Sequence, residues 1–175
     1  MTNQLSPQGM ADQAKKIYEN GDHLEAAKAF GEAASVATSA GDALLAAEMR
    51  NNQSVALLLA GEAQAALEAV EGTDTLFADA GDFRRQGMAL ANQASALQAL
   101  KRRNEAIDRY KMAGDVLEKA GEGDLRAEVL QLLSALYLSR FKLYDAVITL
   151  QSGLAGVKDP SLKQRIMKKL LFIRL

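Results

Sequence analysis

The fold is decided by the stretch from residue 40 to residue 82, which reads AGDALLAAEMRNNQSVALLLAGEAQAALEAVEGTDTLFADAGD. Its opening pair Ala40-Gly41 returns as Ala80-Gly81 and again as Ala120-Gly121, and each pair is followed by an acidic residue. An interval of 40 residues fits four times into the 175 residues of the chain. A fixed interval of this size is typical of stacked repeats, so the sequence predicts an internal repeat.

Small and large side chains recur in one register through all four copies. Three columns of residues spaced 40 apart hold small side chains, namely Ala14, Ser54, Ala94 and Ser134, then Ala26, Ala66, Ala106 and Ala146, then Ala33, Thr73, Ala113 and Gly153. Two further columns hold larger ones, namely Ile17, Leu57, Leu97 and Tyr137, then Phe30, Val70, Tyr110 and Leu150. Small residues let two helices approach closely while larger neighbours fill the grooves, so the columns predict paired helices.

Each copy predicts two helices. Residues 42–60 contain neither Gly nor Pro and carry apolar residues at helical spacing, and residues 62–80 predict a second helix that ends at Gly81. Ser6-Pro7 is typical of an N-cap with proline at the first helical position, and Asp22 with Glu25 has the spacing of a capping box. No stretch alternates as a strand does, which predicts an all-α protein. One hairpin cannot bury both of its apolar faces, so the hairpins are expected to stack as a solenoid.

The repeat resembles the tetratricopeptide repeat in an extended, 40-residue form. The first copy carries the family pattern best, as Ala14, Ile17, Gly21, Ala26, Phe30 and Ala33. The third and fourth copies depart from it, with Lys101 and Phe141 in place of the turn glycine. The resemblance implies a single domain, a right-handed superhelical solenoid of four helical hairpins. The repeats are expected roughly at residues 7–41, 42–81, 82–121 and 122–158, with a capping helix at 160–175.

Composition excludes several classes of function. The chain is 49% hydrophobic and 25% charged with a net charge of -1, which gives no electrostatic footprint for nucleic acid. It has no cysteine and one histidine, so disulfides, thiolate metal sites and paired imidazoles are excluded, and His23 is expected to pack. We find no apolar run of about 18 residues, no secretory signal, and no motif of nucleotide or metal chemistry. These observations predict a cytoplasmic protein without cofactor, metal or catalysis.

The resemblance implies that the first helix of each hairpin lines a concave groove that binds a protein or peptide. The residues expected to line it are Asn52, Asn92, Lys15, Glu48, Val55, Leu58, Met88, Ser95, Gln131 and Leu138. Asn52 and Asn92 occupy one column, where the family grips a ligand backbone with the amide. The simpler interpretation, which stays open, is two exposed polar residues that happen to repeat. Lys15 is the one charged groove residue of the type that clamps a carboxylate, so no carboxylate clamp is predicted.

The last predicted helix is basic and leaves two interpretations open. Leu162, Ile166, Leu170 and Ile173 are spaced to lie on the preceding hairpin as a cap. The residues that would instead form an interface are Lys163, Arg165, Lys168, Lys169, Phe172 and Arg174. From Asp159 onward the net charge is +4, so the rest of the chain carries -5. The alternative function is therefore an assembly adaptor that contacts an anionic lipid surface or a second copy through this helix.

Overall fold

In the computed structural model, which describes residues 6–171, every regular element is an α-helix and no strand is present in that range. This confirms the all-α class predicted from the sequence. The helices are α1 (Pro7–Glu19), α2 (His23–Ser39), α3 (Ala43–Leu59), α4 (Ala63–Val70), α5 (Thr73–Asp79), α6 (Phe83–Ala99), α7 (Arg103–Lys119), α8 (Gly123–Leu138), α9 (Leu143–Ala155) and α10 (Leu162–Leu171).

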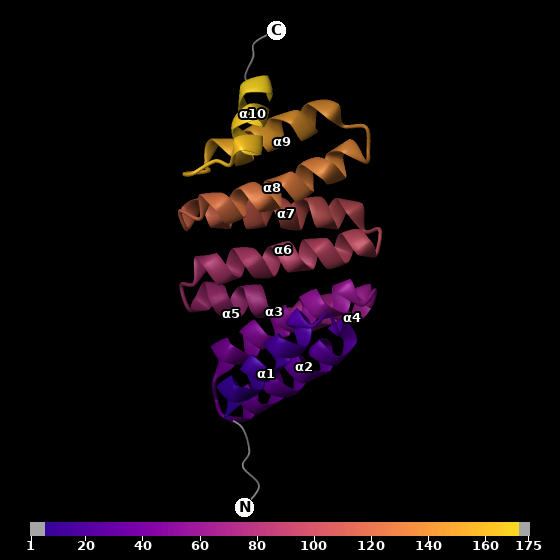
Figure 1. The fold of residues 1–175 in the computed structure, drawn as a ribbon, viewed down its shortest axis with the longest axis vertical. Coiled ribbons are helices and arrows are strands. Elements are labelled where there is room, and N and C mark those ends of the chain that lie inside the picture. The colour runs from indigo at the N-terminus through magenta and orange to yellow at the C-terminus, as the bar shows by residue number, and fades with distance from the viewer. Residues whose placement is uncertain (1–5, 172–175) are drawn as a thin grey trace, which may run out of the picture.

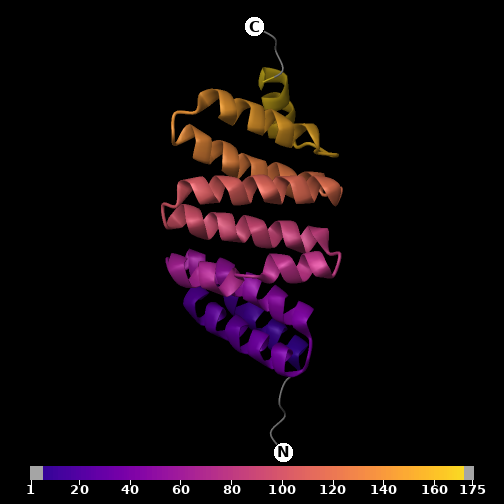
Figure 2. The ribbon, with the colours of Figure 1, turned by 180° about the vertical axis from the view of Figure 1, so that it is seen from behind.

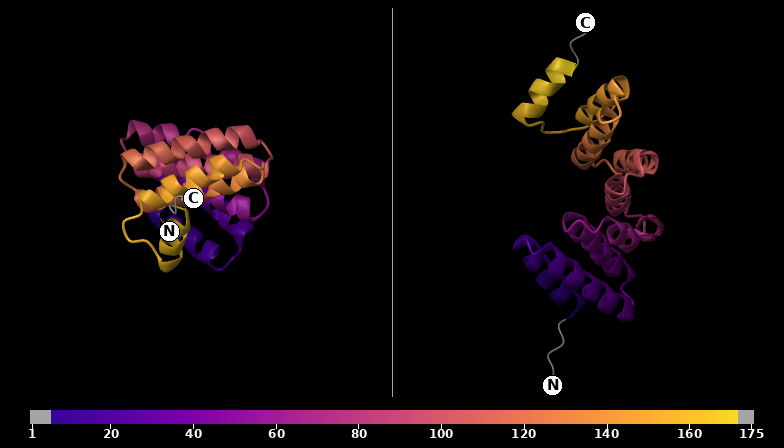
Figure 3. Two further views of the ribbon diagram at one scale, coloured as in Figure 1. Left: turned by 90° about the horizontal axis from the view of Figure 1, so that it is seen from above. Right: turned by 90° about the vertical axis from the view of Figure 1, so that its right-hand side faces the viewer.

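The helices lie across the long axis of the molecule in chain order, from α1 and α2 at one end to α10 at the other (Figure 1). The view from behind gives the same order (Figure 2). Packing joins helices that are near neighbours along the chain, such as α2 with α3, α6 with α7 and α8 with α9. The side view in Figure 3 shows α6 and α7 displaced from the line between α1 and α10, so the stack is bowed.

A left-handed residue ends a helix every 20 residues. Gly21, Gly41, Gly61, Gly81 and Gly121 all have positive φ, as the sequence predicts for glycines at helix ends. Lys101 (φ 62°) and Phe141 (φ 58°) adopt the same conformation without being glycine. The backbone hydrogen bonds are kept as well, because the amide of Arg102 donates to the carbonyl of Leu97 at 2.9 Å, as Asp42 donates to Ala37. The turn is therefore uniform although its sequence is not.

The predicted helix starts are confirmed in part. Ser6 accepts from the amide of Gly9 at 3.1 Å and Pro7 is the first residue of α1, as predicted. Asp42 accepts from the amide of Leu45 at 2.9 Å. The capping box predicted for Asp22 and Glu25 is wrong. Asp22 makes no side-chain cap bond, and Glu25 pairs with Lys28 at 3.3 Å, one turn further along the helix, rather than reaching back.

The single helix predicted over residues 62–80 is wrong. α4 ends at Val70 and α5 begins at Thr73, because Glu71 is extended (ψ 130°) and Gly72 is left-handed (φ 75°). Thr73 is fully buried at this break, where its hydroxyl donates to the carbonyl of Val70 at 2.9 Å and accepts from Asn51 at 3.0 Å. Glycine is a poor helix former, and these buried hydrogen bonds hold the bend in place.

The hydrophobic core is spread along the stack in three clusters. One surrounds Phe30 between the first helices, a small one surrounds Phe77 at the break, and the third surrounds Tyr110 between α6 and α9. Alanine supplies many of the buried contacts, including Ala26, Ala66, Ala106 and Ala146 of one repeat column. At each end of the stack, the terminal hairpin of the described chain has one face that no further hairpin covers.

α10 contacts α9, but its apolar stripe faces solvent. Leu162 is 72% and Ile166 52% exposed, so the prediction that these two lie on the preceding hairpin is wrong. The side chain of Leu170 and residue Ile173 lie outside the described part of the chain. A reciprocal capping box sets the start of the helix, since Ser161 and Gln164 each bond the other's backbone amide. Gln164 also lines a cavity that residues of α8 and α9 border.

Candidate functional site

A cavity of about 330 Å³ lies between α1, α2 and α3. Its lining residues are Lys15, Tyr18, Phe30, Glu48, Asn52 and Val55. Four of these six, all except the two aromatic residues, belong to the groove predicted from the sequence. The structure therefore brings together residues from two first helices, α1 and α3, over the second helix α2 that separates them in the chain.

The floor of this cavity is apolar and partly aromatic. Phe30 is buried, and its ring centroid lies 6.4 Å from that of Tyr18 at a tilted angle. His23 packs on the other side of Tyr18 at 5.6 Å, in the packing role that the sequence predicts for it. The sequence prediction missed Tyr18 and Phe30 as lining residues. Tyr18 could have been found, because it follows Lys15 by three residues and so shares a face of α1 with it.

The rim of the cavity is polar. Lys15 is exposed, and Asn52 is half-buried and forms no side-chain hydrogen bond with any residue in the range 6–171. Glu48 is already engaged, because its carboxylate accepts from Arg85 of α6 at 3.0 Å. Asn52 thus presents both a donor and an acceptor beside the apolar floor, without a competing partner in the fold.

Asn92 stands in the same column as Asn52 but is used differently. Its Nδ2 donates to Oδ1 of Asn51 at 3.1 Å, across the contact between α6 and α3. Asn51 is 8% exposed and donates in turn to the carbonyl of Ala47 and to Thr73, both at 3.0 Å. The Asn92 side chain therefore links neighbouring hairpins through a hydrogen bond.

The other predicted groove residues do not share the cavity. Ser95 is 3.0 Å from the hydroxyl of Tyr110, whose pKa is raised by burial, and Leu58 packs against the first core cluster. Met88 and Leu138 are exposed on α6 and α8. Gln131 lines a separate cavity of about 170 Å³ between α8, α9 and α10. Four of the ten predicted residues therefore form a cluster at α1 and α3, and the other six are distributed along the stack.

A charged cluster ties the cavity to the next hairpin. Arg85 bonds both Glu48 at 3.0 Å and Asp82 at 2.6 Å, and its guanidinium lies 5.0 Å from the ring centroid of Phe77. The pKa of Asp82 is lowered, first by the hydrogen bond from the backbone amide of Arg85 and then by the side chain of Arg85 and the charge of Arg84, while burial opposes the shift. The cluster fixes Glu48 at one side of the cavity mouth.

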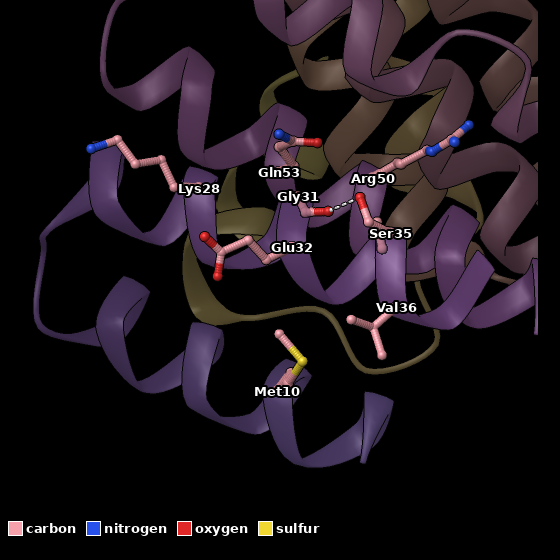
Figure 4. Close-up of a pocket in the computed structure, with 9 residues that line it drawn as sticks. Met10, Lys28, Gly31, Glu32, Ser35, Val36, Arg50 and Gln53 are labelled. Carbon is pink, nitrogen blue, oxygen red and sulfur yellow. Dashed lines mark hydrogen bonds between the residues drawn. The ribbon is translucent and has the colours of Figure 1, made fainter. Parts of the chain in front are cut away.

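A broader depression of about 750 Å³ is lined by Arg50 and Gln53 of α3 (Figure 4). Its other labelled lining residues come from α1 and α2, and they are Met10, Lys28, Gly31, Glu32, Ser35 and Val36. Gly31 makes room for Gln53, whose amide nitrogen would lie 2.6 Å from a Cβ at that position. The sequence prediction missed this depression, which carries charges of both signs and no aromatic floor.

The basic helix α10 presents its charges to solvent. Lys163, Arg165 and Lys169 are exposed, and Lys168 is half-buried. Phe172 and Arg174, also predicted for this interface, lie outside the described residues. Across residues 6–171 no group of three or more His, Asp or Glu side chains is placed to hold a metal ion. None of the helices in that range is long and apolar enough to span a membrane.

Comparison with known proteins gives no family for the chain. A scan against models of protein families found no match, and a search of curated proteins found no similar sequence.

Proposed function

We propose that this chain is a tetratricopeptide-type repeat protein that binds a peptide or a partner helix and performs no catalysis. In this proposal the four hairpins form a right-handed superhelical solenoid with the first helices on its inner side. The uniform left-handed turn every 20 residues supports it, as does packing that joins near neighbours along the chain. Both features are expected where each repeat contacts only the repeats beside it.

The cavity between α1 and α3 is the proposed anchor point. An apolar side chain of the ligand would lie on Tyr18, Phe30 and Val55, while the Asn52 amide bonds the ligand backbone. Lys15 and Glu48, at the rim of the cavity, would select among ligands by their charge. The observation that carries the proposal is that Asn52 has no hydrogen-bond partner in the described fold although it borders an aromatic floor. The cavity volume falls at the lower end of the roughly 300–1,000 Å³ typical of ligand sites.

The test starts from a peptide selected on the immobilised full chain from a random peptide phage library. The selected peptide is titrated against the wild type and the Asn52→Ala and Val55→Asp variants by calorimetry. We expect Asn52→Ala to weaken binding about 3- to 10-fold, the equivalent of one hydrogen bond, and Val55→Asp to weaken it more. Gln98→Ala, an exposed polar residue of α6, is the matched control and should bind normally. Unchanged affinity in both cavity variants would show that this cavity is not the binding site.

One observation favours a second function at α10. Leu162 and Ile166 are exposed on one stripe, and Lys163, Arg165 and Lys169 flank it. An apolar stripe bordered by basic residues suits a helix lying in the surface of an anionic membrane. Sedimentation with vesicles of phosphatidylserine and phosphatidylcholine tests this. We expect salt-sensitive binding that Lys163→Glu with Lys169→Glu abolishes, and wild-type protein left entirely in the supernatant would reject it.

A further inference from the structure

The first half of α9, with the turn before it, exposes an apolar surface. Five side chains form it, and their exposed fractions are 90% for Phe141, 64% for Leu143, 78% for Tyr144, 41% for Val147 and 44% for Ile148. The four helical positions fall within one side of α9, since residues three and four apart share a face. We call these five side chains the α9 apolar face. Its two aromatic rings are among the most exposed large apolar groups of the described chain.

The corresponding positions of the earlier repeats show that this face is a local feature of the fourth hairpin. The column of Ile148 holds Lys28, Glu68 and Asp108, which are all charged and exposed. The column of Tyr144 holds Leu24, Gln64 and Asn104, of which two are polar. Where earlier hairpins present polar groups to water, α9 presents apolar ones. Repetition of the fold therefore does not by itself account for the exposed rings.

Val147 stands at a repeat position that is buried in the third hairpin. Its equivalent in the third hairpin, Ile107, is 7% exposed and shares a core cluster with Leu130 and Leu133 of α8, the first helix of the next hairpin. Val147 has no such cover, since α10 meets α9 near Leu150 and Leu154, in the second half of that helix. Within the α9 apolar face, Val147 therefore occupies a hairpin-packing position whose partner the described chain does not supply, whereas the columns of Tyr144 and Ile148 face solvent in every hairpin.

The opposite end of the stack is polar. Every exposed residue of α1 is polar or charged, namely Gln8, Asp12, Gln13, Lys15, Lys16 and Glu19. A polar outer face is what a terminal hairpin needs in water. It also offers no apolar counterpart to the α9 apolar face, so copies stacked end to end would bury aromatic rings against charges. A covering surface of matching chemistry is found on the α9 apolar face itself.

We propose that the α9 apolar faces of two copies of this chain pack against each other about a two-fold axis. Such an isologous interface pairs the same patch on both subunits and closes at a dimer. Aromatic side chains bury about 150–250 Å² each, so the five side chains at their observed exposures supply roughly 600 Å² per copy. A stable interface of standard size buries about 800 Å² per partner, and a polar rim around the rings supplies the remainder.

Local charge permits this pairing. Residues 122–158 carry four acidic and four basic side chains, a net charge of zero, whereas residues 42–81 carry seven acidic and one basic, a net charge of -6. Lys142 and Asp145, which border the α9 apolar face, are 4.0 Å apart and opposite in sign. Two copies can therefore bring their fourth hairpins together without the like-charge repulsion that their second hairpins would meet. This dimer does not depend on the proposed ligand cavity, because that cavity lies between α1, α2 and α3, away from the fourth hairpin.

The experiment measures the mass of the full chain by sedimentation velocity over about 1 to 100 μM, the range in which micromolar association is seen. We expect a dimer at the high end. The test variant, Tyr144→Asn with Ile148→Asp, copies the residues of the third hairpin at the same columns, where they are exposed and compatible with folding. It should associate about 30-fold more weakly, as expected for loss of a central aromatic contact. The control Leu24→Asn changes the same column in the first hairpin and should stay dimeric.

Three results would overturn the proposal. The first is a wild type that is monomeric throughout this range, and the second is a double variant with circular dichroism like that of the wild type that remains a dimer. The third concerns a different occupant of the surface. It is a monomer whose binding to phosphatidylserine vesicles is lost in Tyr144→Asn with Ile148→Asp, which would assign the α9 apolar face to a membrane.

Discussion

Asn92 donates from Nδ2 to the Oδ1 of Asn51 at 3.1 Å and so links two helices that are one repeat apart. Asn51 is buried and also reaches Thr73 beside the break between α4 and α5. One pair of amides therefore connects the contact between the second and third hairpins to the only interrupted helix within residues 6–171. The side chain next to Asn51, Asn52, points instead into the cavity at α1.

Removing the buried member of this pair should be costly. We expect Asn51→Ala to lower the free energy of unfolding by about 1–3 kcal/mol, because it removes the donor to the buried Thr73 hydroxyl and the acceptor of the Asn92 amide. Asn92→Ala should cost about 1 kcal/mol or less, since Asn92 is half-buried. Urea unfolding measures both. Asn52→Ala is the matched control, and a loss there equal to that of Asn51→Ala would contradict this assignment.

The backbone strain at the two left-handed turns without glycine can be relieved by substitution. Lys101 holds φ at 62°, a conformation that costs an L-residue about 1–2 kcal/mol, and its side chain is exposed. Lys101→Gly should therefore raise the free energy of unfolding by roughly 0.5–1 kcal/mol after the added flexibility of glycine in the unfolded chain is subtracted. Thermal unfolding checks the sign. A lower melting temperature than that of the wild type would contradict the left-handed turn.

The close contact between the start of α8 and the end of α9 depends on Gly123 more than on Gly156. A Cβ on Gly123 would overlap the carbonyl oxygen of Gly156, and backbone cannot yield as a side chain can. A Cβ on Gly156 would lie 3.7 Å from its nearest neighbour, which is an ordinary contact. We expect Gly123→Ala to destabilise the fold by about 1–3 kcal/mol and Gly156→Ala to leave it nearly unchanged. Equal unfolding midpoints for the two variants would exclude this close approach.

The bond between Asp82 and Arg85 should depend on pH. The pKa of Asp82 is lowered in the folded state, first by the backbone amide of Arg85, so the carboxylate stabilises the fold above its unfolded pKa. That contribution is lost as pH falls through the folded pKa, below about 4. Asp82→Asn keeps an N-cap but loses the charge. Its deficit, expected to be up to about 1 kcal/mol at neutral pH for a partly exposed pair, should shrink in acid. A deficit independent of pH in urea titrations would refute the role of charge.

Local sequence determined most of the secondary structure. The glycines at 40-residue spacing, the uninterrupted run from 42 to 60 and the Ser6-Pro7 cap each act within a few residues, so they can be recognised without knowing the fold. Two local predictions still failed. Glu25 pairs with Lys28 instead of closing a capping box, and the helix expected over residues 62–80 breaks at Gly72.

Only part of the candidate site could be predicted from the sequence. Lys15, Glu48, Asn52 and Val55 were expected in one groove and do line one cavity, because register places them on matching faces of α1 and α3. Asn92 shares the register of Asn52 but is drawn toward Asn51. Register fixes which side of a helix a residue occupies. It does not fix which neighbour satisfies its hydrogen bonds.

The sequence by itself determined an all-α chain with a recurring turn, since helix propensity, capping and glycine conformation depend on residues close together in the chain. Only the tertiary structure decided where the chain lacks cover. The exposure of Tyr144 and Ile148 on α9, like that of Leu162 and Ile166 on α10, depends on whether another helix lies over them. Burial is a property of distant segments packed together, and an apolar stripe in the sequence looks the same whether or not its partner is present.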